Sequence, residues 1–338
     1  MIRVALLLPL LLLTLAPSPG EAAPKVSFEQ RSSEHMATSV AVTLPDTSDV
    51  DVLAGLIFAR MAEVDRIMNE WKPGSPLAEV NRTAGEKSQV VPDELLGIAK
   101  RGMELGALTG GSFDISWAAL WGLWDFRAKT PTLPDAKEVA KRAALVDYRL
   151  VVIDDEGSTL FLPEAGMKLG LGGIAKGWAL DTSVAILAAQ GVKDFLVTAG
   201  GQVYAGGRNG DRPWRVGIRD PRGAASDFFA IVEAENVSVS TSGDYERFFM
   251  IDGVRYHHIL DPKTGQPARG LRSATVVSPD ATLADALSTA LMVMGPAKAL
   301  ALVETLADAE CVLVDGHAQV LVSSGLKDAL IVRHQPAK

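Results

Sequence analysis

The sequence predicts an α+β fold in which helices flank mostly antiparallel sheets. Segments with helical periodicity occur along most of the chain, and short strands separated by turn residues fill positions 194–278. The regular alternation of strand and helix that predicts a parallel sheet is absent. The 338-residue chain has no internal repeat or long linker after its first residues, so we expect one compact unit over residues 24–338.

The first 23 residues have the pattern of a cleaved secretory signal. Arg3 precedes an apolar run over residues 4–15, and Ala22 and Ala23 end a region of small residues and prolines. The run is shorter than the roughly 18 residues of a membrane-spanning helix, although an N-terminal anchor is the alternative. No cysteine follows it to carry a lipid. We therefore expect an exported, periplasmic protein that is soluble after cleavage.

Charge and cysteine content narrow the function. The formal net charge of −8 argues against nucleic acid as a partner and is compatible with a bound divalent cation. The single cysteine, Cys311, excludes an internal disulfide. It lies in an apolar, strand-like run, so we expect a buried structural thiol.

The helices are predicted from apolar spacing and from residues that begin or end helices. Asp49 precedes the first periodic segment, and Gly110-Gly111 ends the second. The predicted helices span residues 52–71, 92–109, 135–144, 174–190, 283–294 and 296–307. Strands are predicted at residues 39–44, 149–153 and 159–162, at several places within 194–278, and at 311–316 and 318–324.

The stretch LGLGGIAKGWALD, residues 169–181, combines a glycine-rich loop with the start of a helix. A dinucleotide fingerprint beginning at Gly170 is one interpretation, but the preceding strand is short. The next strand carries its acid, Asp194, at its start instead of its end. A Walker loop is excluded because a glycine follows Lys176. The sequence favours a loop whose backbone groups and following helix N-terminus bind an anion, without specifying which ligand carries it.

Lys176 lies in the first turn of the predicted helix, where a cation is unfavourable for helix stability. A lysine in this position beside glycines indicates anion binding. The alternative is a tight turn with a solvated lysine.

Two of the five histidines, His257 and His258, are adjacent in the stretch YHHILDPKTG. In a strand they face opposite sides, so they do not form one metal-binding pair, and no other ligand lies at zinc spacing. One histidine in a cleft suits proton transfer or a hydrogen bond to phosphate. The alternative is that both are structural.

Asp285 and Thr289 share one face of a predicted helix, away from its apolar stripe. A carboxylate and a hydroxyl suit Mg²⁺, which takes few protein ligands and completes its shell with phosphate and water. The alternative is a capping box formed by Thr282 and Asp285, with Thr289 merely exposed.

Two further segments of the sequence indicate function less specifically. Residues 240–245 (STSGDY) form a polar turn suited to anions, and residues 110–114 (GGSFD) accompany several tryptophans. Such aromatic residues belong to the core more often than to a cofactor site. The tryptophans concerned are Trp71, Trp117, Trp121 and Trp124.

Taken in order, these segments resemble the ApbE family of flavin transferases, which move FMN from FAD onto a protein. The resemblance runs from Met36 to about Val332. It implies that the chain forms a single catalytic unit with the ApbE fold, which is similar to the T-fold. The stretches that carry it are HMATSVAV, WKPGSPLAEVN, TGGSFDIS followed by LWGL, LGLGGIAKGWALD, TAGGQVYAGG, STSGDYERFF, HHILDPKTGQP and ADALSTALMVMG.

The resemblance also implies roles for individual residues. His258 matches the catalytic histidine of the family. The implied FAD site comprises Met36, Trp71, the backbone of Ser112, Phe113 and Asp114, Gly170, Lys176 and Ile259. The implied Mg²⁺ ligands are Asp285, Thr289 and the carbonyl of Gly173.

The chain departs from the family pattern at two site positions and in its lack of a lipid-anchoring cysteine. It has Met36-Ala37-Thr38 where the family usually has M-G-T, and the extra methyl is expected to narrow the flavin site slightly. Gly170 stands where the family commonly has an aspartate, which removes a carboxylate expected near the adenosine or the metal.

The implied reaction is Mg²⁺-dependent transfer of FMN from FAD to a threonine or serine hydroxyl of an acceptor protein, with release of AMP. Acceptors in the family include subunits of membrane redox complexes and exported electron carriers, so membrane contact is expected only through the acceptor. The alternatives are hydrolysis of FAD to FMN and AMP, and a non-catalytic periplasmic flavin-binding protein.

Overall fold

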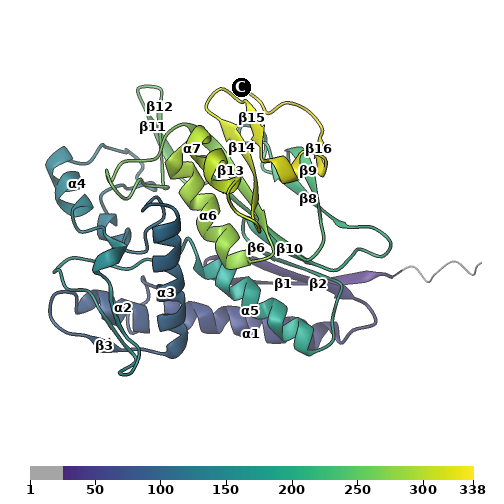
Figure 1. The fold of residues 1–338 in the computed structure, drawn as a ribbon, viewed down its shortest axis with the longest axis horizontal. Helices are drawn as coiled ribbons and strands as arrows, with labels where there is room; N and C mark the ends of the chain where they lie inside the picture. Colours follow the sequence, from purple (N-terminus) through teal and green to yellow (C-terminus); the bar gives the residue numbers. More distant parts are fainter. Residues whose placement is uncertain (1–25) are drawn as a thin grey trace, which may run out of the picture.

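The computed structural model describes residues 26–338, so the signal peptide expected at residues 1–23 lies outside the described residues. Its core is an eight-stranded sheet in which every neighbouring pair is antiparallel (Figure 1). In spatial order its strands are β1 (Phe28–His35), β2 (Thr38–Pro45), β6 (Phe195–Ala199), β7 (Gln202–Gly206), β10 (Val237–Gly243), β13 (Leu271–Ser278), β14 (Glu310–Asp315) and β15 (Val320–Val322).

Three small sheets accompany the central one. Their strands are β8 (Trp214–Arg219), β9 (Phe228–Ala234) and β16 (Leu330–Val332); β11 (Phe248–Ile251) and β12 (Val254–His257); and β3 (Gln89–Val90), β4 (Val152–Asp154) and β5 (Thr159–Phe161). The β16-β9-β8 sheet covers one face of the central sheet, where Trp214 and Phe229 are buried together with Val239 of β10.

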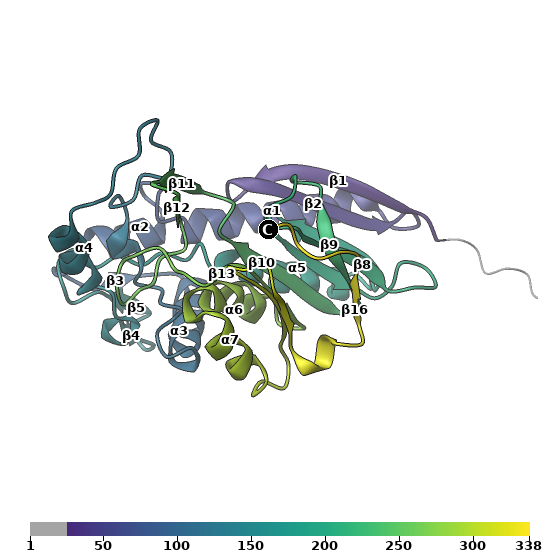
Figure 2. The same ribbon diagram turned by 90° about the horizontal axis from the view of Figure 1, so that it is seen from above.

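Helices cover the opposite face of the central sheet (Figures 1 and 2). The helices on this face are α1 (Val50–Met68), α5 (Ala175–Ala189), α6 (Ala281–Met294) and α7 (Pro296–Val303). Beside the sheet lie α2 (Pro76–Arg82), α3 (Asp93–Leu108) and α4 (Ala136–Ala143), and short 3-10 turns occur at Ala118–Leu120, Tyr148–Leu150 and Ser324–Leu326. The α+β class with mostly antiparallel sheets is therefore confirmed.

The six predicted helices are present. The short strands β3 and β16 were not predicted, and neither were two further elements. These are β1, which pairs with β2 in a hairpin, and α2, whose N-cap Ser75 accepts a hydrogen bond from the N–H of Ala78. The strand predicted at residues 149–153 is a 3-10 turn followed by β4. Within residues 26–338, no helix combines the length and the apolar character needed to cross a membrane.

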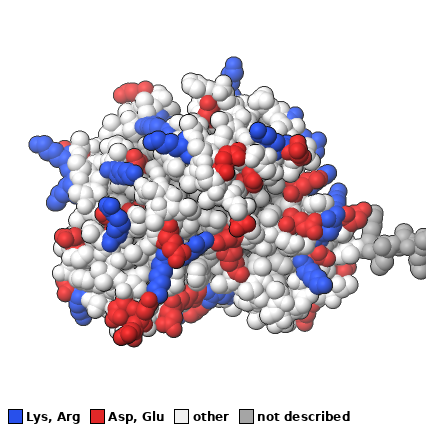
Figure 3. Space-filling model, in the orientation of Figure 1, with Lys and Arg blue, Asp and Glu red and all other residues white. Residues whose placement is uncertain are grey.

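Two expectations from composition can be compared with the structure. Cys311 is buried in β14, and burial raises the pKa of its thiol to about 12, as expected for a structural cysteine. On the face shown in Figure 3, acidic and basic side chains are interspersed.

Helices α5 and α6 cross at very close range, and this crossing positions the site. A Cβ built on Gly177 would lie 2.2 Å from the carbonyl oxygen of Ala281. The Asp181 carboxylate accepts hydrogen bonds of 2.8 Å from the backbone N–H groups of Ala281 and Thr282. Asp181, the last residue of LGLGGIAKGWALD, therefore holds the start of α6 against α5.

We expect Gly177→Ala to lower the free energy of unfolding by about 1–3 kcal/mol, because the new methyl overlaps the α6 backbone. Urea denaturation measures the change. The matched control is Gly55→Ala in α1, where an added Cβ meets nothing within 4 Å and helix propensity favours alanine by roughly 1 kcal/mol. Equal stability of the two variants would contradict the close crossing.

Candidate active site

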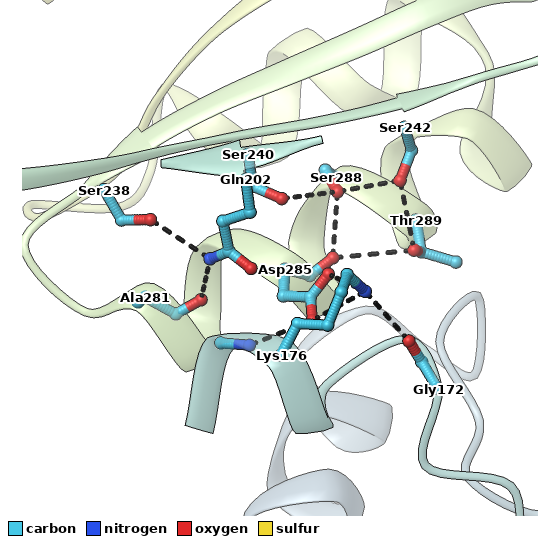
Figure 4. A network of polar contacts seen from close by, with 11 residues as sticks. Gly172, Lys176, Gln202, Ser238, Ser240, Ser242, Ala281, Asp285, Ser288 and Thr289 are labelled. Atoms are coloured by element: carbon cyan, nitrogen blue, oxygen red, sulfur yellow. Dashed lines mark hydrogen bonds and ion pairs between the residues drawn. The ribbon is translucent and has the colours of Figure 1, made fainter. Parts of the chain in front are cut away.

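The glycine loop ends beside a buried carboxylate on α6 (Figure 4). The Lys176 Nζ lies 3.2 Å and 3.3 Å from the two carboxylate oxygens of Asp285 and donates to the Gly172 carbonyl at 3.0 Å. The Gly177 N–H donates to Asp285 Oδ2 at 3.1 Å. Lysine and aspartate, 109 residues apart in sequence, thus form the charged centre of the site.

Asp285 is 4% exposed and belongs to no capping box. The N-cap of α6 is Asp280, which accepts from the Leu283 N–H at 2.7 Å, and the Thr282 hydroxyl donates to Asp181. The capping-box alternative is therefore wrong. A buried carboxylate needs a cation, and here Lys176 supplies it.

Hydroxyl groups continue the site along α6. Ser242 Oγ lies 2.8 Å from Ser288 Oγ and 3.2 Å from Thr289 Oγ1. A Cβ built on Gly173 would lie 3.6 Å from Thr289 Oγ1, so the loop approaches this hydroxyl closely. The structure thus brings together the residues expected to bind metal and phosphate, namely Gly173, Lys176, Asp285 and Thr289.

The chemistry of this group fits a hard cation with few protein ligands. One carboxylate, hydroxyls and a nearby loop carbonyl are oxygen donors of the kind that Mg²⁺ takes alongside water and phosphate. Within residues 26–338, no group of three or more His, Cys, Asp and Glu side chains is placed to hold a metal ion. This donor set is unlike that of a structural zinc site.

Met36 lies in the tight turn of the β1–β2 hairpin. Met36 and Ala37 both have left-handed backbone conformations, with φ of 51° and 57°. The Ala37 side chain is exposed, so its methyl affects mainly the backbone of the turn, where a left-handed residue other than glycine costs about 1–2 kcal/mol. The partly buried Met36 packs against the main core.

Trp71 and Trp121 form an exposed aromatic pair. Their ring centroids lie 3.7 Å apart, and the side chains are 46% and 48% exposed. The expectation of core positions is wrong for both, whereas Trp124 is buried. Because an exposed aromatic pair offers a flat apolar surface, Trp71 is suited to contact a planar ring.

The segment from Ser112 to Asp114 borders the glycine loop. A Cβ on Gly173 would lie 3.3 Å from the ring of the buried Phe113. The Asp114 carboxylate accepts from the Ser116 N–H at 2.8 Å and from the Tyr148 N–H at 3.0 Å, and its pKa is raised mainly by burial. Its side chain is committed to the local fold, which leaves the backbone for a ligand.

Gly170 has no space for a side chain. A Cβ would lie 2.7 Å from Trp117 Nε1, and that indole N–H donates to the Gly170 carbonyl at 2.9 Å. The Gly170 N–H donates to the Ile115 carbonyl at 2.8 Å. An aspartate here would displace Trp117, so the glycine belongs to the packing of this wall.

Two residues at the loop were missed from the sequence. Asn81 both donates to and accepts from the backbone of Leu169, at 2.8 Å and 2.7 Å, and so holds the start of the loop. The carboxylate of Glu70 lies 3.9 Å from a Cβ built on Gly172, and burial raises its pKa to about 7. Both contacts join segments about 90–100 residues apart, which no local pattern marks.

We expect Glu70→Gln to stabilise the ligand-free protein above pH 7. The raised pKa of Glu70 means that ionisation opposes folding, so wild-type stability falls as the pH rises from about 4.5 to about 7. Glutamine removes the free-energy cost of ionising Glu70, which is of order 1 kcal/mol or more. Stability should then depend less on pH between about 4.5 and 7. Urea titrations at pH 5 and pH 8 in chelator measure it. The exposed Glu86→Gln is the control, and a gain equal at both pH values would contradict the assignment.

The two histidines lie at the end of β12, and only His257 belongs to the strand. His257, the last residue of β12, is 3% exposed, and its Nε2 lies 2.8 Å from the Ala268 carbonyl oxygen. The pKa of His258 is lowered to about 4, first by burial and then by the charges of His257, Arg247 and Lys176. His258 is therefore neutral at pH 7 and lies within electrostatic reach of Lys176.

The following residue, Ile259, is buried, and its carbonyl accepts from the Ala268 N–H at 2.9 Å. His258 Nδ1 has no hydrogen-bond partner among residues 26–338. A neutral imidazole with an unpartnered nitrogen is suited to accept a proton.

Comparison with known proteins identifies the family of this chain. The sequence model of the ApbE family matches residues 36–313. A protein of Treponema pallidum named FAD:protein FMN transferase is 34% identical over 291 residues, which are 82% of this chain and 80% of that protein. One of the same name from Klebsiella pneumoniae is 33% identical over 266 residues, which are 77% of this chain and 76% of that protein.

Solved structures agree in fold. The ApbE protein of Thermotoga maritima has a TM-score of 0.82 at 32% identity and covers 90% of this chain and 99% of its own. The flavin transferase ApbE of Vibrio cholerae has a TM-score of 0.80 at 28% identity, again with 90% and 99% covered. Since the family model spans most of the chain and the named relatives match over about four fifths of it, this chain belongs to the ApbE family.

Proposed function

We propose that this protein is an enzyme that transfers FMN from FAD to a threonine or serine hydroxyl of an acceptor protein and releases AMP. The observation that carries the proposal is the convergence of Lys176, Asp285 and Thr289 at the end of the glycine loop, with the neutral His258 in electrostatic reach. The names of the relatives point to the same activity.

In this proposal the site holds FAD in two parts. The flavin portion contacts the exposed Trp71, Met36 and the backbone of residues 112–114. Ile259 completes the FAD site. Lys176 and the N-terminus of α5 face the pyrophosphate, where a cation and free N–H groups favour negative charge. Gly170 contributes backbone only, because Trp117 fills the space beside it.

Asp285, Thr289 and the carbonyl of Gly173 would hold Mg²⁺. When bound, Mg²⁺ neutralises charge on the pyrophosphate and favours departure of the AMP phosphate. Lys176 neutralises Asp285, and with a divalent cation on that carboxylate the ammonium group would contact phosphate instead.

The reaction exchanges one phosphorus–oxygen bond for another. The acceptor hydroxyl oxygen bonds to the FMN-side phosphorus, and the bond from that phosphorus to the bridging oxygen breaks. The electron pair leaves with AMP, and the hydroxyl proton passes to His258. The residues contribute positioning, charge neutralisation and a base.

The test is to incubate the protein with FAD, Mg²⁺ and a candidate acceptor. A covalent FMN mass on the acceptor together with free AMP is the expected result. Free FMN with an unlabelled acceptor would indicate hydrolysis instead, and unchanged FAD would indicate a flavin-binding protein.

We propose that the acceptor is exported or belongs to a membrane redox complex, and that this protein meets the membrane only through it. The proposal rests on the secretory pattern of residues 1–23. Fractionation of cells that express the full chain, with N-terminal sequencing of the product, tests export and cleavage.

A further inference from the structure

A cavity of about 180 Å³ lies where the ends of β10, β12 and β13 meet, and none of the residues assigned above to the active site lines it. We call it the arginine pocket, because four guanidinium groups surround it. Its charged and titratable lining residues are Arg222, Arg255, Arg269, Arg272, Asp244 and His257.

Two of the arginines bond to protein groups through both terminal nitrogens. Arg222 forms two 2.7 Å hydrogen bonds with the carboxylate of Asp244. Arg272 donates to the carbonyls of Gly316 and Ala337, at 2.8 Å and 2.7 Å. Asp244 is the only carboxylate that lines the pocket, so the four arginines carry an excess of three positive charges over it.

The other two arginines lack a carboxylate partner within hydrogen-bond distance among residues 26–338. Arg255 Nε lies 3.9 Å from Asp244 Oδ2, and its Nη1 makes only a 3.4 Å contact with the Asp244 carbonyl. Arg269 donates to the Arg255 carbonyl and lies over the ring of Tyr256. These guanidinium groups therefore keep donors available for a ligand.

The charges in the pocket repel one another. The pKa of Arg255 is lowered, first by burial and then by Arg222 and Arg272, although arginine remains protonated. Partly buried like charges are unfavourable unless an anion lies among them. An anion would remove this repulsion.

His257 is a further buried residue at the wall of the arginine pocket. It is 3% exposed and lines the pocket, and its Nδ1 has no hydrogen-bond partner within the described residues. Burial lowers its pKa first; Asp244 raises it, and Arg269 and Arg255 lower it. Because Nε2 faces a carbonyl oxygen, it carries the proton of the neutral ring, and Nδ1 is an acceptor. The partner that this buried atom lacks is therefore a donor, such as the O–H of a hydrogen phosphate.

We propose that the arginine pocket binds one oxyanion group, a phosphate or a carboxylate. Planar guanidinium groups bind both in bidentate geometry. The pocket is close to the active site, because Asp244 follows Ser242 by two residues and His257 directly precedes His258. A spacing of two residues, as between Ser242 and Asp244, is about 7 Å along a strand. The oxyanion comes from a free small anion or from an acidic side chain of the acceptor; only the second source rests on the proposed function.

Calorimetric titration of the full protein with inorganic phosphate, in chelator and at constant ionic strength, tests the pocket. We expect Arg255→Gln and the more exposed Arg269→Gln each to weaken phosphate binding by about tenfold or more. Arg215→Gln, which removes an exposed arginine paired with Glu233 at 3.0 Å, is the matched control. Lys176→Gln reports binding at the nucleotide site, and circular dichroism checks that each variant folds.

The results distinguish a free anion from an acceptor side chain, and they test the arginine pocket separately from FMN transfer. Phosphate binding that survives Arg215→Gln and Lys176→Gln but falls in both pocket variants supports the pocket, whether or not FMN transfer is observed. A raised KM for the acceptor in the same variants, with kcat unchanged, supports the pocket and assigns the oxyanion to the acceptor. Phosphate binding lost only with Lys176→Gln, or no phosphate binding together with an unchanged KM, overturns the proposal.

Discussion

Asp285→Asn is expected to lower FMN transfer by about a thousandfold, with only partial recovery at high Mg²⁺. Asparagine keeps the shape and still accepts from the Gly177 N–H, but it removes the charge that pairs with Lys176 and would bind the cation. Initial rates of acceptor labelling over a range of Mg²⁺ concentrations measure the loss. FAD binding in chelator is expected to change less than transfer does.

The matched control lies on the same helix. Asp280 caps the N-terminus of α6, and asparagine caps helices about as well as aspartate, so Asp280→Asn should retain transfer within about twofold. If Asp285→Asn kept in chelator the full transfer rate that the wild type has with Mg²⁺, the metal assignment would be wrong.

His258→Gln is expected to lower kcat by about 10²- to 10⁴-fold while leaving the affinity for FAD within a few-fold, because the base acts on the hydroxyl of the acceptor. The exposed His317→Gln, in the turn between β14 and β15, is the control. Single-turnover labelling separates the chemical step from binding. Wild-type kcat in His258→Gln would remove the histidine from the mechanism.

The pH profile tests the same residue. Since the pKa of His258 is lowered to about 4, the imidazole stays unprotonated from pH 8 down to about pH 5. The wild-type acid limb should therefore lie below the ordinary histidine value of 6.5 and be absent in His258→Gln. An acid limb near 6.5 or above would contradict a buried neutral base.

The helices were predictable because their signals are local. Apolar spacing, Asp49 and the glycines at 110–111 placed α1 and α3 to within a few residues. Helix α2 has only seven residues, too few for periodicity to show, and β1 depends on pairing with β2.

The site was predictable only in part. Each half of the Lys176–Asp285 pair had a local signal, but their contact depends on the crossing of α5 and α6. The capping-box alternative failed because Asp181, 100 residues before Ala281, satisfies the first N–H groups of α6 beside Asp280. The exposure of Trp71 and the lack of space at Gly170 likewise depend on partners distant in sequence, Trp121 and Trp117.

The bonds of Asp181 to the start of α6 have a consequence for how the enzyme accommodates its substrate. LGLGGIAKGWALD meets the ligand site with its first residues and holds α6 with its last, so loop, α5 and α6 form one rigid unit. The spacing between Lys176 and Asp285 is thus preorganised before FAD arrives, and little ordering entropy is lost there. We expect adaptation to the substrate at residues outside this unit, such as the exposed Trp71 and Trp121.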